Sequence, residues 1–183
     1  RLRVIADSQS AFLMLDNCDG FGGVFKDKPV ESYFDIACTS FHAAHIISTG
    51  EGGAVLTSLK NIAEYARQYR DWGRFKGDDD DSIIQGYPNR YTHVVRGFNL
   101  KPLELQAAKG LVQLGKLDTF FAARARNHAF LKKAFGKHSE VFTTVSTING
   151  AKPCWFSFPY VAHDGRKKVS EFFESKNIET RPI

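Results

Sequence analysis

Residues 40–53 have the sequence Ser-Phe-His-Ala-Ala-His-Ile-Ile-Ser-Thr-Gly-Glu-Gly-Gly, and this stretch decides how the rest of the chain is interpreted. It overlaps an apolar segment, residues 36–41, that predicts a β-strand, and its glycines lead into a second candidate strand at residues 54–57. Ligands bind at the carboxyl ends of strands in open α/β sheets. The polar turn that carries His42 and His45 is therefore the first candidate for a functional site.

Two histidines three residues apart also raise the possibility of a metal site. The sequence offers no cysteine close to His42 and His45 and no clear third ligand, so we predict that no metal is bound. The three cysteines, at positions 18, 38 and 154, are far apart and odd in number. This pattern argues against a disulfide framework or a Cys-x-x-Cys metal site and is typical of a reducing cytoplasm.

Periodicity along the chain predicts an α/β region followed by a smaller α+β unit. The apolar run at residues 11–15 predicts a buried parallel strand, and Ser58 and Gly73 are candidates for the start and stop of a helix between them. Further helices are predicted from Pro102 to Leu117, at 118–135 and at 167–175, with Val169, Phe172 and Phe173 facing inward, and further strands at 141–145 and 156–161. We place a boundary near residue 136, where Gly136 ends a helix.

Composition favours an ordinary cytoplasmic enzyme. The formal net charge is +5, but the lysines and arginines are scattered, which argues against nucleic-acid binding. No apolar run approaches the ~20 residues of a membrane helix. The acidic run at residues 78–81 is expected to be a solvated loop rather than a cation site. The chain starts without methionine and stops abruptly at Ile183, so we expect that both ends are truncated.

The histidine-containing stretch resembles a motif of the DegT/StrS sugar aminotransferases, Ser-Phe-His-x-x-Lys-x-x-x-x-Gly-Glu-Gly-Gly. The match has no gap, and His45 stands where the family has its cofactor-binding lysine. Three other motifs resemble the family in the same order: residues 15–22 (Leu-Asp-Asn-Cys-Asp-Gly-Phe-Gly), 97–99 (Gly-Phe-Asn) and 104–108 (Glu-Leu-Gln-Ala-Ala). The resemblance covers nearly the whole chain.

The resemblance implies a fragment of the fold type I architecture of pyridoxal 5′-phosphate (PLP) aminotransferases. Residues 1–136 would form part of the cofactor-binding large domain, a mainly parallel sheet with flanking helices. Residues 137–183 would form part of the small α+β C-terminal domain. The N-terminal region that supplies a Gly-Thr phosphate cradle in the family is not in this sequence.

Within this family, histidine in place of lysine marks the 3-dehydratases that act on CDP- or GDP-linked 4-keto-6-deoxyhexoses. Residues 70–74 (Arg-Asp-Trp-Gly-Arg) resemble the CDP type, but residues 75–85 lack the cysteines of its iron–sulfur insertion. Such a cluster needs about four thiolates, so none is expected. Residues 179–183 resemble the GDP type, and the nucleotide therefore stays open.

The resemblance also assigns roles to the candidate residues. An imidazole cannot anchor PLP covalently, but its pKa suits proton transfer, so His45 is the predicted catalytic base for a loosely held pyridoxamine 5′-phosphate (PMP). Asp16 would face the pyridine nitrogen, and Asp19 would lie over the cofactor ring. Ser40 would bind the cofactor phosphate, and Asn99 would reach a cofactor across a dimer interface.

Simpler structural explanations exist for several of these residues. Asp16 and Asn99 could be helix caps, Ser40 could be a strand-end hydroxyl, and His45 could be a plain loop histidine. Arg181, which we predict to contact substrate, could equally form a surface salt bridge.

The expected partners are a nucleotide-diphosphate sugar, glutamate as a possible amino donor, and a second copy of the chain in a homodimer. Two alternatives remain. The first is a PLP-dependent nucleotide-sugar aminotransferase that uses another lysine, such as Lys26 or Lys101. The second is a catalytically inactive, dimeric family member.

Overall fold

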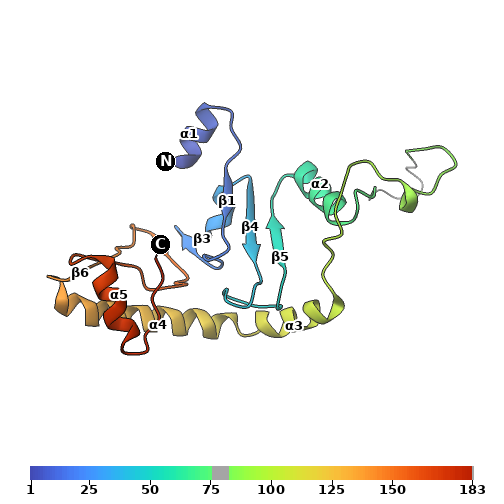
Figure 1. Ribbon diagram of the computed structural model, residues 1–183. Helices are drawn as coiled ribbons and strands as arrows, with labels where there is room; N and C mark the ends of the chain where they lie inside the picture. Colours follow the sequence, from blue (N-terminus) through green and yellow to red (C-terminus); the bar gives the residue numbers. More distant parts are fainter. Residues whose placement is uncertain (76–82, 183) are drawn as a thin grey trace.

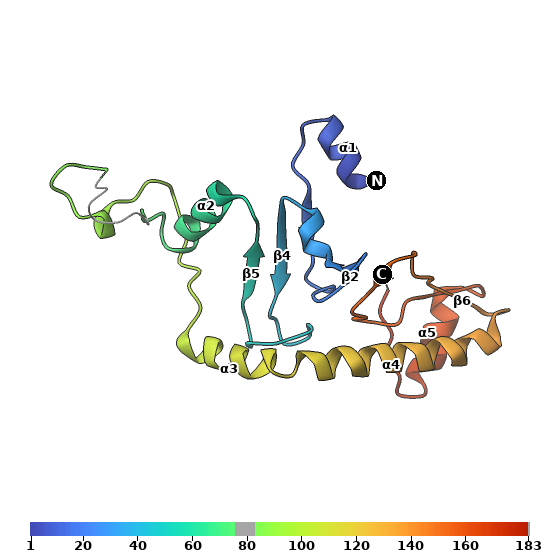
Figure 2. The ribbon, with the colours of Figure 1, turned by 180° about the vertical axis from the view of Figure 1, so that it is seen from behind.

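A rod of two consecutive helices runs along one side of the molecule. The computed structural model describes residues 1–75 and 83–182, and in it α3 (Glu104–Leu114) is followed almost directly by α4 (Leu117–Phe135) (Figure 1). The N-terminal sheet lies on one side of this rod. The C-terminal elements pack around the C-terminal part of α4, as the opposite view also shows (Figure 2). The rod therefore connects the two regions that the sequence predicts.

The central sheet has the strand order β1 (Met14–Asp16), β4 (Ile36–Ser40) and β5 (Gly53–Leu56). Strands β1 and β4 are parallel, as predicted, with Asp16 opposite Cys38, whereas β5 returns antiparallel to β4. These pairings place the ends of β1 and β4, where the candidate site residues lie, at the same edge of the sheet.

Strand β1 is shorter and less buried than the apolar run at residues 11–15 predicts. The N–H of Leu13 donates a hydrogen bond to the side-chain Oδ2 of Asp35 at 2.7 Å rather than to a strand partner. The ladder between β1 and β4 therefore begins only at Met14. One face of the sheet is open: Met14 is 58% exposed and Val55 is 49% exposed. The prediction of a buried strand is therefore wrong for this chain.

Helix α2 (Lys60–Arg70) forms where the periodicity predicts it, but Ser58 does not cap it. The helix begins after Leu59, whose N–H is bound by the hydroxyl of Thr57 at 3.1 Å. Beyond the helix, Gly73 donates its N–H to the carbonyl of Gln68 with φ at +81°, which ends the helix as predicted. The chain then pairs with residues 92–100, and a 3₁₀ turn, η3 (Asn89–Tyr91), precedes that segment.

The C-terminal region contains β6 (Phe142–Thr144) paired antiparallel with β8 (Tyr160–Ala162), and helix α5 (Arg166–Glu174). Val169 is buried, as predicted, but Phe172 is 59% exposed, so its predicted inward orientation is wrong. The core of the C-terminal region is a cluster of five aromatic rings: Phe135, Phe142, Phe158, Tyr160 and Phe173. The strand predicted at 156–161 forms only from Tyr160.

Several short elements have no counterpart in the predictions. They are α1 (Leu2–Ser8), β2 (Val24–Phe25), β3 (Lys28–Pro29), β7 (Ala151–Lys152) and the 3₁₀ turns η1 (Val30–Tyr33) and η4 (Gly136–His138). Strand β2 pairs with both β3 and β7, which ties residues 151–152 to the N-terminal half of the chain. The division at residue 136 stays a prediction.

Two expectations concern stretches that the structure describes only in part or not at all. The acidic loop, residues 77–82, lies outside the described residues, and so does most of the cysteine-free stretch 75–85. Within residues 1–75 and 83–182, no helix has the length and apolar character needed to span a bilayer.

Replacing Gly73 by alanine should destabilise the protein. A Cβ at this position would overlap the carbonyl oxygen of Val95, and the positive φ is unfavourable for any side chain. The strain alone costs about 1–3 kcal/mol, so the urea midpoint should fall. Gly136→Ala is the matched control, because Gly136 has helical angles and open space around it. The control should change stability little or raise it by about 0.4–1 kcal/mol; equal midpoints for both variants would contradict the structure.

Candidate active site

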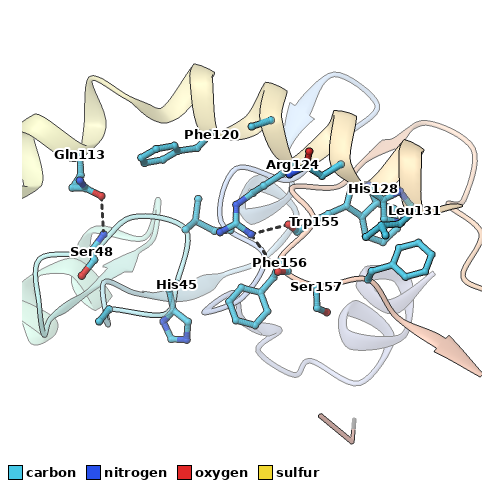
Figure 3. A pocket seen from close by; sticks show the side chains of 15 residues that line it. His45, Ser48, Gln113, Phe120, Arg124, His128, Leu131, Trp155, Phe156 and Ser157 are labelled. Carbon is cyan, nitrogen blue, oxygen red and sulfur yellow. Dashed lines mark hydrogen bonds between the residues drawn. The ribbon is translucent and has the colours of Figure 1, made fainter. Parts of the chain in front are cut away.

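His45 lies in a turn between β4 and β5 that rests on the helical rod. The turn begins with a bond from the N–H of His45 to the carbonyl of His42 at 3.0 Å, and Ile46 and Ile47 behind it are buried. Side chains of α3 hold its far end. Gln113 accepts from the N–H of Ser48 at 3.5 Å (Figure 3), and Gln106 donates to the carbonyl of Glu51 at 3.0 Å.

The imidazole of His45 is largely enclosed, with 19% of the side chain exposed. Its Nε2 lies 3.2 Å from Oδ1 of Asp19. The rings of His42 and Phe156 approach it edge-on, at centroid distances of 5.5 and 5.9 Å. Its Nδ1 is buried and has no hydrogen-bond partner among the described residues. The imidazole thus has one polar side-chain contact, between Nε2 and the Asp19 carboxylate, whereas Nδ1 is buried and unpaired.

Asp16 ends β1 with its carboxylate exposed to solvent. The thiol and the backbone N–H of Cys18 donate to this carboxylate, the latter at 3.1 Å, and lower its pKa. The nearby His45 lowers the pKa of Asp16 further. The same contact raises the pKa of the Cys18 thiol to about 11. Asp16 is therefore an anion at the end of β1. Its carboxylate accepts hydrogen bonds from Cys18 in the turn that follows the strand, so it does not act as a helix cap.

Ser40 shares a sheet face with Asp16. Asp16 is opposite Cys38 in the parallel register, and Ser40 follows two residues later, so these side chains project to the same side. The hydroxyl of Ser40 accepts from the N–H of His42 at 3.2 Å. The sheet thus brings four predicted residues to one edge: Asp16, Asp19, Ser40 and His45.

Asn99 and Arg181 are not part of this group. The side-chain oxygen of Asn99 accepts from Nζ of Lys101 at 3.0 Å, and its backbone pairs with Asp71 beyond the end of α2. It does not cap α3, which begins after Leu103. Both Asn99 and Arg181 are exposed, and neither lines the cavity next to His45.

That cavity has a volume of about 570 Å³ and extends from His45 along α4 to residues 155–158 (Figure 3). It introduces residues that the sequence analysis did not consider, of which Arg124, His128, Trp155 and Phe156 are the most prominent. Arg124 and His128 are one turn apart on α4, and only that spacing could have indicated a shared role. No lysine is among the described residues that line the cavity. The described part of the chain also contains no group of three or more residues suited to hold a metal ion.

The fold is that of a fold type I PLP-dependent aminotransferase over the part that this chain covers. The solved structure of a GDP-4-keto-6-deoxy-D-mannose 3-dehydratase from Escherichia coli, with bound hydrated PLP, matches with a TM-score of 0.85 at 26% identity. That match covers 100% of this chain and 49% of the solved chain. The predicted fold class is confirmed.

Residues 1–183 match the model of the DegT/DnrJ/EryC1/StrS aminotransferase family, and the chain belongs to this family. The lipopolysaccharide biosynthesis protein RfbH of Salmonella typhimurium is 32% identical over 98% of this chain and 45% of its own length. A dTDP-4-dehydro-2,6-dideoxy-D-glucose 3-dehydratase of Saccharopolyspora spinosa is 34% identical over 97% of this chain and 42% of its own. Proteins named as sugar-nucleotide transaminases are also among the matched relatives, at 27% and 25% identity. The chain thus spans about half the length of the curated relatives it matches.

The residues at the sheet edge fit a vitamin B6 cofactor. Asp16 is an exposed anion, and a protonated pyridine nitrogen requires such a partner. The unpaired, buried Nδ1 of His45 shows that this imidazole is not already committed to two structural hydrogen bonds. These two side chains, with Asp19 and Ser40 beside them, are the groups that would hold the cofactor here.

The reactivity of Cys18 reports on the charge of Asp16. At pH 8 a thiol with a pKa of about 11 has roughly 100-fold less thiolate than one with a pKa of 9, so Cys18 should react slowly with iodoacetamide. Asp16→Asn removes the negative charge and should accelerate this alkylation, as followed by mass spectrometry in protein with Cys38 and Cys154 replaced by alanine. Equal rates before and after Asp16→Asn would show that the carboxylate does not control the thiol.

Proposed function

We propose that this protein is a PMP-dependent 3-dehydratase that removes the C3 hydroxyl from a nucleotide-linked 4-keto-6-deoxyhexose. The observation that carries the proposal is an imidazole, His45, at the lysine position of an aminotransferase motif, with Asp16 and Asp19 close to it. Relatives named as 3-dehydratases support it, at 34% and 26% identity. The reaction belongs to deoxysugar and lipopolysaccharide biosynthesis, and we place the enzyme in the cytoplasm.

The proposed chemistry divides between the cofactor and the side chains. When bound, the cofactor supplies an amine that condenses with the sugar ketone and a ring that accepts electrons. Asp16 keeps the pyridine nitrogen protonated, because an anion at that place favours the charged form. His45 removes a proton from the cofactor's C4′ carbon and delivers one to the departing C3 hydroxyl. We assign these transfers to Nε2, because Nδ1 is buried and Nε2 lies 3.2 Å from the exposed Asp19.

The remaining residues bind and orient. Ser40 is proposed to donate to the cofactor phosphate, and Asp19 to lie over the cofactor ring. Asn99, which is exposed and does not line the His45 cavity, is proposed to act in the site of a partner subunit in a homodimer. Arg181 is proposed to contact the substrate. No iron–sulfur cluster takes part in this proposal, and glutamate would restore the cofactor amine.

The aminotransferase alternative needs a lysine at the cofactor. Lys101 is bound elsewhere: its Nζ lies 3.2 Å from the carboxylate of Asp71 and over the ring of Trp72. Lys26 lies over the ring of Phe25, in the turn between β2 and β3. Neither lysine lines the His45 cavity. These positions favour the dehydratase, although transaminases are among the relatives.

Turnover of 4-keto-6-deoxy sugars tests the proposal. The full-length protein, supplied with PMP, should eliminate the C3 hydroxyl from one member of a panel of CDP-, GDP- and dTDP-linked substrates. Glutamate should sustain repeated turnover if PLP is formed. His45→Asn should reduce kcat by about 10²–10⁴-fold, because a positioned base contributes that much. The product, a 3-deoxy-4-keto sugar, is identified by mass spectrometry as a net loss of one oxygen atom, because PMP supplies two electrons as it becomes PLP and its amine nitrogen leaves as ammonia.

Two results would reject the dehydratase. One is formation of an amino sugar without loss of the hydroxyl, which would support an aminotransferase. The other is the absence of any reaction across the panel, which would support an inactive, dimeric family member. An unchanged kcat for His45→Asn would reject the assigned role of this residue.

A further inference from the structure

The Phe156 ring forms one wall of the His45 site. It approaches the imidazole edge-on, with an interplanar angle of 65°. The other contacts of the imidazole are the edge of the His42 ring, at 5.5 Å, and Asp19, which is 59% exposed; Nδ1 has no hydrogen-bond partner among the described residues. Phe156 is therefore one of the few groups that set the orientation of the imidazole.

Phe156 belongs to a segment without regular secondary structure. The sequence predicts a strand from residue 156, but the ladder with β6 begins only at Tyr160. The carbonyls of Trp155 and Phe156 instead accept from Nη1 of Arg124 on α4, at 2.8 and 3.3 Å (Figure 3). Hydrogen bonds from a charged donor are stronger than those between neutral groups. Arg124 thus replaces a neighbouring strand as the partner of this backbone.

A second residue of α4 holds the same segment. The His128 ring, one turn beyond Arg124, stacks on the indole of Trp155 at a centroid distance of 3.5 Å and an interplanar angle of 4°. Burial lowers the pKa of His128, and the charge of Lys132 lowers it further, which favours a neutral ring in this stack. Two adjacent turns of one rigid helix therefore fix residues 155–156 from the same side.

We infer that Arg124 is a positioning residue for His45, acting through the backbone of Trp155 and Phe156. The inference rests on the proposed function, because it assigns Arg124 a part in keeping the catalytic imidazole aligned. Loss of the guanidinium frees both carbonyls and allows the Phe156 ring to withdraw from His45. A displacement of about 1 Å at a reacting group can reduce the rate by about 10²-fold.

The kinetic test compares Arg124→Gln with Arg126→Gln in the full-length enzyme. Arg126 lies on the same helix and is exposed, so its replacement is the matched control. Arg124→Gln should lower kcat by about 10- to 100-fold with little change in KM, and Arg124→Lys should restore part of kcat. Equal kcat values for the glutamine variants at positions 124 and 126 would overturn the inference.

A double-mutant cycle with Phe156→Leu tests the route. If Arg124 acts through Phe156, the loss in the double variant should be smaller than the product of the single losses. Independent, multiplicative losses would overturn the route through Phe156. Phe156→Leu also provides the test if Arg124→Gln does not fold, because it removes the ring and leaves the arginine bonds intact. Unchanged kcat for Phe156→Leu would then contradict the inference.

A readout that needs no turnover separates this inference from the proposed reaction. In protein labelled with ¹³C-histidine, the His45 resonance is assigned by its loss in His45→Asn. Arg124→Gln should shift that resonance, while Arg126→Gln should leave it unchanged. A shift in a protein without dehydratase activity would support the positioning role and reject only the proposed function. An unshifted resonance would overturn the positioning role.

Discussion

The candidate site depends on one constraint, which is that separate turns of the chain are held against a single long helix. Helix α4 contacts the turn of Asp19 through Phe121, whose ring lies where a side chain at Gly22 would be. It holds the Trp155–Phe156 backbone through Arg124. Because a helix is stiff, these contacts fix the two walls of the His45 site relative to each other.

The sheet supplies the other half of the arrangement. The parallel pairing of β1 with β4 puts Asp16 and Ser40 on one face of one edge, and the return of β5 closes the turn that carries His45. The open face of this sheet carries exposed apolar side chains, including Met14 and Val55. Apolar surface of this kind marks a contact surface, which agrees with a chain that spans about half the length of its curated relatives.

The sequence predicted those features that local patterns encode. The helix stopped before Gly73, the helix ending at Phe135 and the parallel pairing of β1 are all present. The fold class was predicted from the family motifs rather than from periodicity, and the match to a solved structure confirms it. Four of the predicted site residues lie at one sheet edge, although their roles toward a cofactor stay predictions.

The features that the sequence analysis missed depend on long-range contacts. The segment at 156–159 has the composition of a strand, but Arg124 binds its carbonyls, and no local pattern reveals such a partner. Phe172 has the spacing of an inward residue, yet the aromatic cluster uses Phe173 instead. Asn99 and Arg181 were assigned to ligands by resemblance alone; both are exposed, neither lines the cavity next to His45, and their roles stay predictions.

The central claim is that His45 replaces a covalent anchor with a proton-transfer group. It is tested most directly by borohydride reduction of the full-length protein with PLP, followed by peptide mass spectrometry. The account predicts no lysine adduct in the natural protein and an adduct at position 45 in the His45→Lys variant, which shows that PLP reaches the site. A stable adduct on any lysine of the natural protein would contradict the account.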